Sequence, residues 1–169
     1  MNSAEHEADI RLYKAWPIRP MVCQQIGRGW TMTKKALEKL IRYTEDHPYH
    51  RFIGVNIEEI KRGTSIVSMT PAENMLTIAG VVHAGVYYTI LEVAAFLACV
   101  SISPDDQIPA TTNINVSVMR AVSKGDLKVK AKVLKIGKRN CFIESRILDE
   151  DGNVIATGLI TKAMLPHTK

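Results

Sequence analysis

Residues 86–102, VYYTILEVAAFLACVSI, decide the fold of this chain. The segment is apolar on nearly every side, as expected for a helix that is buried all round. Glu92 interrupts the apolar run, and the run is shorter than the roughly 20 residues that a bilayer-spanning helix needs. We therefore predict a buried helix over 86–101, ended by the turn residues 103–106, and no membrane segment.

The residues after this helix alternate between apolar and polar side chains, which is typical of half-buried strands. In the first predicted strand, 112–118, Thr112, Ile114, Val116 and Val118 alternate with polar residues. Three more strands are predicted over 127–133, 141–148 and 154–165. The Asp151-Gly152 pair predicts a hairpin between the last two.

The residues before the long helix predict a shorter helix and two strands. Apolar positions from Thr33 to Thr44 follow helical spacing, and Pro48 is a plausible stop. Segments 52–60 and 64–69 are rich in Ile and Val and flank Lys61-Arg62-Gly63, so we predict two strands joined by a tight turn. Residues 1–30 show little periodicity and are predicted to be an irregular extension.

The order of these elements indicates the fold class. Two strands, a long apolar helix and then four consecutive strands form a meander that buries the helix only by curling around it. We predict an α+β fold with an antiparallel sheet wrapped around a long buried helix. Residues 1–50 form an N-terminal extension with a short helix in this interpretation, and 51–169 form the main domain.

Composition narrows the kind of protein. A chain of 169 residues with 46% apolar and 23% charged residues fits a single globular domain. The net charge is +5, and the sequence contains no block of five like charges, so we expect no nucleic-acid partner. The basic composition nevertheless favours a small polyanionic ligand. The odd number of widely spaced cysteines and the absence of an export signal predict a reduced, cytoplasmic protein without a metal site.

Residues that carry chemistry concentrate in 77–85, TIAGVVHAG, and at Glu92. A carboxylate inside an apolar helix is costly, so its position asks for a functional reason. This region resembles the hot-dog thioesterases, in particular the branch with the phenylacetyl-CoA and 4-hydroxybenzoyl-CoA thioesterases. The helix start of that branch reads Gly-x-x-His-Gly-Gly, with Asp or Glu nine residues after the His, and Gly80, His83, Gly85 and Glu92 match it. The likeness extends over 52–165.

The resemblance implies a hot-dog fold, hydrolysis of acyl-CoA thioesters, a homodimer or homotetramer, and no cofactor. It assigns Glu92 as general base or nucleophile, two roles that the sequence does not separate. The N–H groups of Ala84 and Gly85 at the helix start would stabilise the oxyanion. His83 either shapes the helix start or touches the substrate.

Ala84 replaces the first glycine after the His of the family pattern, which is tolerable if only its N–H matters, and two further positions depart from that pattern. Thr77 stands six residues before His83, where the family carries Asn or Gln to orient the substrate or water, and Asn74 is nearby but out of register. A hydroxyl that some relatives place one turn after the carboxylate is replaced here by Phe96. These departures motivate an alternative, a noncatalytic protein that binds or senses acyl-CoA. A dehydratase or hydratase of acyl thioesters is a further alternative, which the spacing of His83 and Glu92 disfavours.

The spacing along the helix also predicts an oligomer. Ala84 and Glu92 are eight residues apart, or roughly 12 Å along the helix axis at about 1.5 Å per residue. One carbonyl cannot readily touch both, so we expect Glu92 of one subunit to lie beside the helix start of another.

Candidate substrate-binding residues complete the prediction. Asn74 and Gly80 lie near the helix start. Flexible cations at strand ends and turns are suited to the phosphates of coenzyme A. These cations are Arg120, Lys124, Lys138 and Arg139.

Overall fold

The computed structural model of the chain describes residues 23–26 and 29–166. It contains, in chain order, β1 (Cys23–Ile26), β2 (Gly29–Met32), α2 (Lys34–Asp46), α3 (Pro48–Ile53), β3 (Asn56–Lys61), β4 (Thr64–Met69), the 3-10 turn η1 (Glu73–Met75), α4 (Ala84–Val100), β5 (Gln107–Val118), β6 (Leu127–Ile136), β7 (Asn140–Leu148) and β8 (Val154–Pro166).

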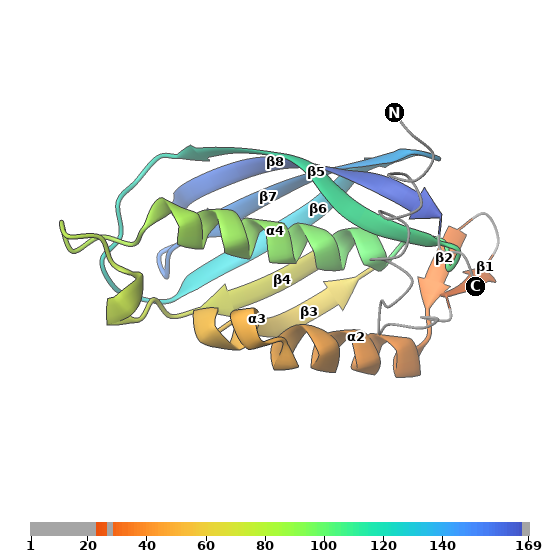
Figure 1. Cartoon of the computed structure of the whole chain (residues 1–169), viewed down its shortest axis with the longest axis horizontal. Coiled ribbons are helices and arrows are strands. Elements are labelled where there is room, and N and C mark those ends of the chain that lie inside the picture. Colours follow the sequence, from red (N-terminus) through yellow and green to blue (C-terminus); the bar gives the residue numbers. More distant parts are fainter. Residues whose placement is uncertain (1–22, 27–28, 167–169) are drawn as a thin grey trace, which may run out of the picture.

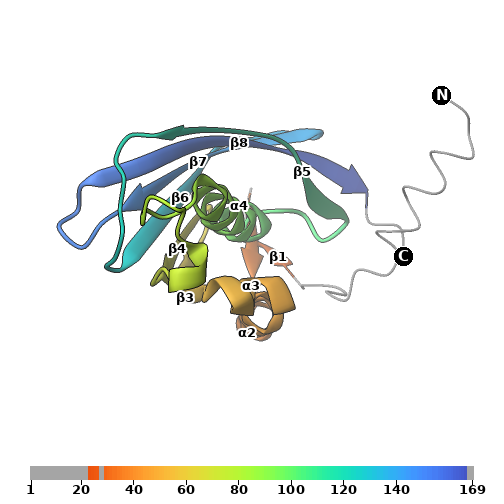
Figure 2. The ribbon, with the colours of Figure 1, turned by 60° about the vertical axis from the view of Figure 1, so that its left-hand side comes forward.

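Six strands form one antiparallel sheet in the order β3-β4-β6-β7-β8-β5. The sheet curls over α4, and α2 and α3 lie on the other side of that helix (Figures 1 and 2). The α+β class, the antiparallel sheet around a long helix and the N-terminal helix are thereby confirmed. β5 crosses over to pair with β8, which makes it an edge strand.

Helix α4 forms the centre of the core, as its uniform apolarity predicts. It spans 84–100, so it begins two residues before the predicted start. Two buried serines of the sheet fix its position: Ser65 Oγ donates to Ala94 O at 2.7 Å and Ser145 Oγ donates to Leu91 O at 3.1 Å. None of the helices described by the structure is long and apolar enough to cross a membrane.

The N-terminal segment corrects two expectations. Residues 23–26 and 29–32 pair as an antiparallel hairpin, although residues up to 30 were predicted to be irregular, while 1–22 lie outside the described residues. Helix α2 ends at Asp46, just before the predicted stop at Pro48, but Pro48 then begins α3, because proline suits the first position of a helix. Helix α3 therefore occupies the start of the strand predicted over 52–60 and crosses the domain boundary drawn at residue 50.

Strand β5 begins at Gln107, five residues before the predicted start, and carries a β-bulge. Thr111 pairs with Lys162 of β8, whereas Asn113 pairs with Thr161, so two residues of β5 oppose one of β8. Beyond the bulge, Ile114 lies opposite the buried Ile160 and so faces the helix side of the sheet.

Candidate active site

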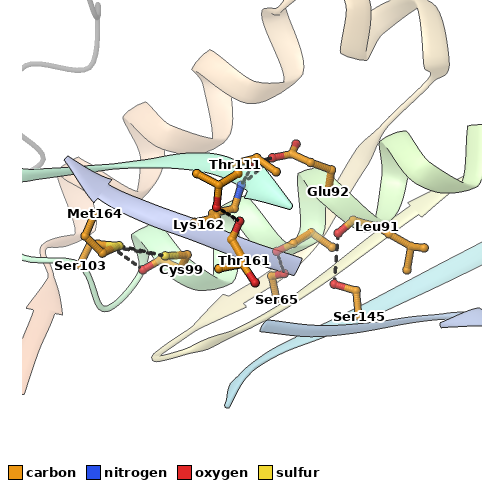
Figure 3. Close-up of polar contacts among 12 residues, drawn as sticks. Ser65, Leu91, Glu92, Cys99, Ser103, Thr111, Ser145, Thr161, Lys162 and Met164 are labelled. Carbon is orange, nitrogen blue, oxygen red and sulfur yellow. Dashed lines mark hydrogen bonds and ion pairs between the residues drawn. The ribbon is translucent and has the colours of Figure 1, made fainter. Parts of the chain in front are cut away.

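Glu92 of α4 contacts two side chains from the sheet. Lys162 of β8 donates from Nζ to Glu92 Oε1 at 2.5 Å, and Thr111 of β5 donates from Oγ1 to the same oxygen at 2.6 Å. Lys162 Nζ also donates to Thr111 Oγ1 at 2.7 Å. The three side chains point toward one another between the helix and the two strands (Figure 3).

The electrostatics of this triad favour an ionised carboxylate. The side chain of Lys162 is only 1% exposed, whereas that of Glu92 is 34% exposed. Burial raises the pKa of Glu92, but the Lys162 ammonium and the hydrogen bonds from Lys162 and Thr111 outweigh it and leave that pKa below its ordinary value. The carboxylate is therefore charged at neutral pH.

The sequence analysis named no partner for Glu92, and the structure supplies two from the sheet. Lys162 was missed, although its position carries a signal: Ile160, Lys162 and Met164 share the helix-facing phase of β8, and all three are buried. A lysine in the apolar phase of a strand indicates a buried anion nearby. Some relatives carry a hydroxyl at the position of Phe96. Here Thr111 supplies a hydroxyl beside the carboxylate.

A cavity of about 330 Å³ opens beside the triad. Its walls come from α2, α3, α4, β5 and β8. The lining residues are Tyr43, Thr44, His47, His50, Glu92, Val93, Phe96, Pro109, Ala110, Thr111 and Lys162. Glu92 is thus accessible to a small molecule that enters between the helices and the edge strand.

His50 is the titratable group of α3 in this cavity. Its Nδ1 donates to Thr44 O at 2.8 Å, which leaves the Nε2 lone pair for another partner. Burial lowers the pKa of His50 below 6.5, and the bond to Thr44 and the Glu92 charge oppose that shift without reversing it. His50 is therefore neutral at pH 7, and sequence reasoning did not single it out.

The start of α4 shows how the predicted oxyanion donors are arranged. His83 caps the helix, because its Nδ1 accepts from the Gly85 N–H at 3.0 Å. The Gly85 N–H is thereby occupied, whereas the Ala84 N–H makes no hydrogen bond within the part of the chain that the structure describes. Ala84 is consequently the ready donor, and Gly85 becomes one only when His83 turns away.

The loop before the helix start holds the other predicted residues. Thr77 accepts at its carbonyl from the Gly80 N–H and at Oγ1 from the Ala79 N–H, and Gly80 has a φ of 72°. Both residues thus build a tight turn, which explains the glycine. Asn74 is exposed in η1. Within the single chain these residues gather at the start of α4, separate from the Glu92 triad.

The four candidate coenzyme A cations fall into two groups. Arg120 and Lys124 lie in the loop whose Val122 carbonyl accepts from the Val82 N–H, so they lie near the start of α4. The hairpin carrying Lys138 and Arg139 instead bonds to Gln107 and Met164 at the far end of β5 and β8. Strand β5 has 12 residues, or roughly 40 Å at about 3.3 Å per residue. A single chain therefore does not bring both groups of cations to one phosphate.

Comparison with known proteins identifies the domain. The model of the thioesterase superfamily matches residues 79–156, which contain the helix start, Glu92 and Thr111. A 1,4-dihydroxy-2-naphthoyl-CoA hydrolase from Listeria monocytogenes is 25% identical over 117 residues, covering 69% of this chain and 95% of that protein.

Solved structures agree with this match. A conserved protein from Pseudomonas aeruginosa superposes with a TM-score of 0.69 at 27% identity, covering 73% of this chain and 98% of that chain. A thioesterase from Haemophilus influenzae superposes with a TM-score of 0.72 at 18% identity, covering 82% of this chain and 94% of that chain. Residues 79–156 therefore match the thioesterase superfamily, and the structure built around them has the hot-dog fold of these structural neighbours.

Proposed function

We propose that this protein hydrolyses acyl-CoA thioesters to a free carboxylic acid and coenzyme A in the cytoplasm. The observation that carries the proposal is an ionised Glu92 facing a cavity within a thioesterase-superfamily domain. The mildly basic chain suits the phosphates of coenzyme A, and the Listeria relative is named for a CoA thioester substrate.

The chemistry requires a carboxylate and an oxyanion donor. In one route Glu92 takes a proton from water, the hydroxide oxygen bonds to the acyl carbon, and the C–S bond breaks to release coenzyme A, which takes up the proton. In the other, the carboxylate attacks the acyl carbon, the thiolate leaves, and water cleaves the resulting anhydride. In both routes an N–H group stabilises the charge on the carbonyl oxygen.

A site of this kind needs two protomers. Ala84 and Glu92 lie on the same helix eight residues apart, or about 12 Å along its axis, which is too far for one carbonyl. Two antiparallel α4 helices would place Glu92 of one protomer beside Ala84 of its partner. This arrangement would also bring the cations of two protomers around one coenzyme A.

The edge of the sheet supports such a dimer. Ile114 and Val118 of β5 are 36% and 43% exposed, and Tyr88 of α4 is 44% exposed. Exposed apolar side chains and the unpaired edge of β5 are features that a second copy would cover.

The experiment that tests this function is a thiol-release assay over a panel of aromatic, medium-chain and long-chain acyl-CoAs. We expect turnover with at least one class. Glu92→Gln keeps the volume but removes the charge, so it should lower kcat by at least about 100-fold while substrate binding persists. Binding by calorimetry without any release of coenzyme A would instead support a noncatalytic acyl-CoA sensor, and unchanged turnover in Glu92→Gln would remove Glu92 from the mechanism.

A further inference from the structure

Lys162 is the buried charge that the proposed reaction does not use. It occupies a helix-facing position of β8 between Ile160 and Met164, where an apolar side chain would be expected. Burying an ammonium group costs several kcal/mol even after relaxation, and replacing a buried ion pair with apolar residues is often neutral or stabilising. Stability of the fold is therefore a weak reason for a lysine here.

The contacts of Lys162 direct its ammonium group at Glu92, Thr111 and Phe96. One N–H group points to Glu92 Oε1 and one to Thr111 Oγ1, and the ammonium lies 5.4 Å from the centre of the Phe96 ring, where a cation–π contact forms. The side chain of Lys162 is only 1% exposed, so its ammonium is directed at these neighbours rather than at solvent. We therefore expect Lys162 to act on the reaction through Glu92 and Thr111.

The same contacts make the two oxygens of Glu92 unequal. Oε1 accepts from both Lys162 and Thr111, whereas Oε2 accepts no hydrogen bond from the residues in 29–166. A carboxylate held through one oxygen has a fixed orientation, and its other oxygen keeps its full ability to accept a proton or attack a carbonyl.

We propose that Lys162 is a positioning residue for thioester hydrolysis, which anchors Oε1 of Glu92 together with Thr111, keeps the carboxylate ionised, and leaves Oε2 as the reacting oxygen. The inference rests on the proposed function and deepens it. Phe96, which replaces the hydroxyl expected one turn after Glu92, then has a role as the apolar face that covers the ammonium.

Other titratable groups nearby do not replace Lys162 in this role. His50 of α3 faces Glu92 and is neutral at pH 7, and His47 and Tyr43 line the same cavity. On the far side, Lys162 lies near Cys99 of α4 and Cys141 of β7. The hydrogen bond with Cys99 and burial raise the pKa of the Cys141 thiol, so it carries no charge to compete for the ammonium.

The pH dependence of kcat tests the proposal on the full chain. Without the ammonium, burial dominates and the pKa of Glu92 rises, so Lys162→Met should move the acidic limb of kcat upward by more than one pH unit. We expect at least a tenfold loss of kcat at pH 6, recovery toward the wild-type rate at alkaline pH, and KM within about threefold. Lys162→Arg, which keeps the charge, should retain the wild-type limb.

A merely structural lysine would give a different result. In that case kcat would fall by the same factor at every pH, or not at all, and either outcome overturns the proposal. Lys135→Met, which removes an exposed lysine of β6, is the control for net charge and should leave the profile unchanged. If Lys162→Met does not fold, Lys162→Gln keeps a donor without the charge and must show the same displacement of the acidic limb.

A second measurement separates this inference from the proposed function. In a chain labelled with ¹³C at glutamate carboxyls, the Glu92 signal is the one lost in Glu92→Gln, and its titration reports protonation without any substrate. We expect its pKa to rise by more than one unit in Lys162→Met. If no acyl-CoA is hydrolysed but the Glu92 pKa rises in Lys162→Met, only the proposed function is rejected. If the Glu92 pKa does not change in Lys162→Met, the role of Lys162 is rejected whatever the activity.

Discussion

Single side chains from distant parts of the chain converge on one carboxylate. Glu92, Thr111 and Lys162 come from α4, β5 and β8, and each has a partner in the other two. Glu92 could be identified from sequence because it interrupts an apolar helix. Lys162 was not identified, since a lysine among alternating residues is normally read as exposed, and only the phase set by Ile160 and Met164 reveals that it faces inward.

The partly buried His50 imidazole should make the free energy of unfolding depend on pH. Burial holds the pKa of His50 in the folded chain below 6.5. At pH values between 6.5 and that lowered pKa, His50 therefore binds a proton more readily in the unfolded chain than in the folded chain. The contribution of His50 to the free energy of unfolding is therefore full above 6.5 and is lost as the pH falls through that window. His50→Asn keeps a donor for Thr44 O but does not titrate.

Urea denaturation at pH 8 and pH 5 measures this effect. The free energy of unfolding of the wild type should fall more between the two pH values than that of His50→Asn. An equal fall in both proteins would show that His50 is not held neutral by the fold.

At the scale of elements, the position of Glu92 depends on how α4 lies on the sheet. Ser65 and Ser145 bond to carbonyls of α4, and Gly158 of β8 lets the helix approach closely. A Cβ at residue 158 would lie 3.3 Å from Leu91 Cδ1, the neighbour of Glu92 in sequence. The helix, the sheet and their contact are thus linked to the geometry of the site.

Gly158→Val tests this contact. The added methyl groups overpack the interface between β8 and α4, so we expect a loss of about 1–3 kcal/mol in the free energy of unfolding. Thermal or urea denaturation gives the value. Leu159→Val, at the adjacent exposed position, is the matched control and should change stability by less than about 0.5 kcal/mol. Equal effects at the two positions would contradict the close approach.

Periodicity predicted most of the elements for physical reasons that remain visible in the structure. The helix over 84–100 is apolar all round because strands cover it, and the strands over 127–136 and 140–148 alternate because one face meets that helix. Helix α3 could not be predicted in this way. Its six residues are too few to show a period, and Phe52 and Ile53 suggested a strand.

On the scale of the whole molecule, the predicted site residues form two groups along one helix, at its start and at Glu92. Sequence spacing already indicated this separation, and it is the reason for expecting a second protomer. Strand 112–118 was predicted to be half-buried, yet Ile114 and Val118 are exposed in the single chain. A dimer across β5 would account for both observations.

The substitution Ile114→Lys tests whether a dimer forms across β5. A charge on the apolar side of the edge strand should weaken the dimer and lower activity at least tenfold at low micromolar protein, while the chain stays folded. Light scattering after size exclusion measures the mass, and circular dichroism checks the fold. Asn115→Lys changes the adjacent residue on the other face of β5 and should remain dimeric and active. Monomers with full activity would refute a site shared between protomers.

The bulge at Thr111 and Asn113 makes one strand serve two purposes. On one side of it, Thr111 points its hydroxyl at Glu92, and on the other side Ile114 faces the same side of the sheet after an odd number of steps. If the strand alternated strictly from Thr111 without the bulge, Thr111 would keep its hydroxyl at Glu92, but Asn113, Asn115 and Ser117 would face the helix side in place of Ile114, Val116 and Val118. One extra residue thus lets a single continuous strand present the Thr111 hydroxyl to Glu92 and apolar side chains to the same side of the sheet farther along.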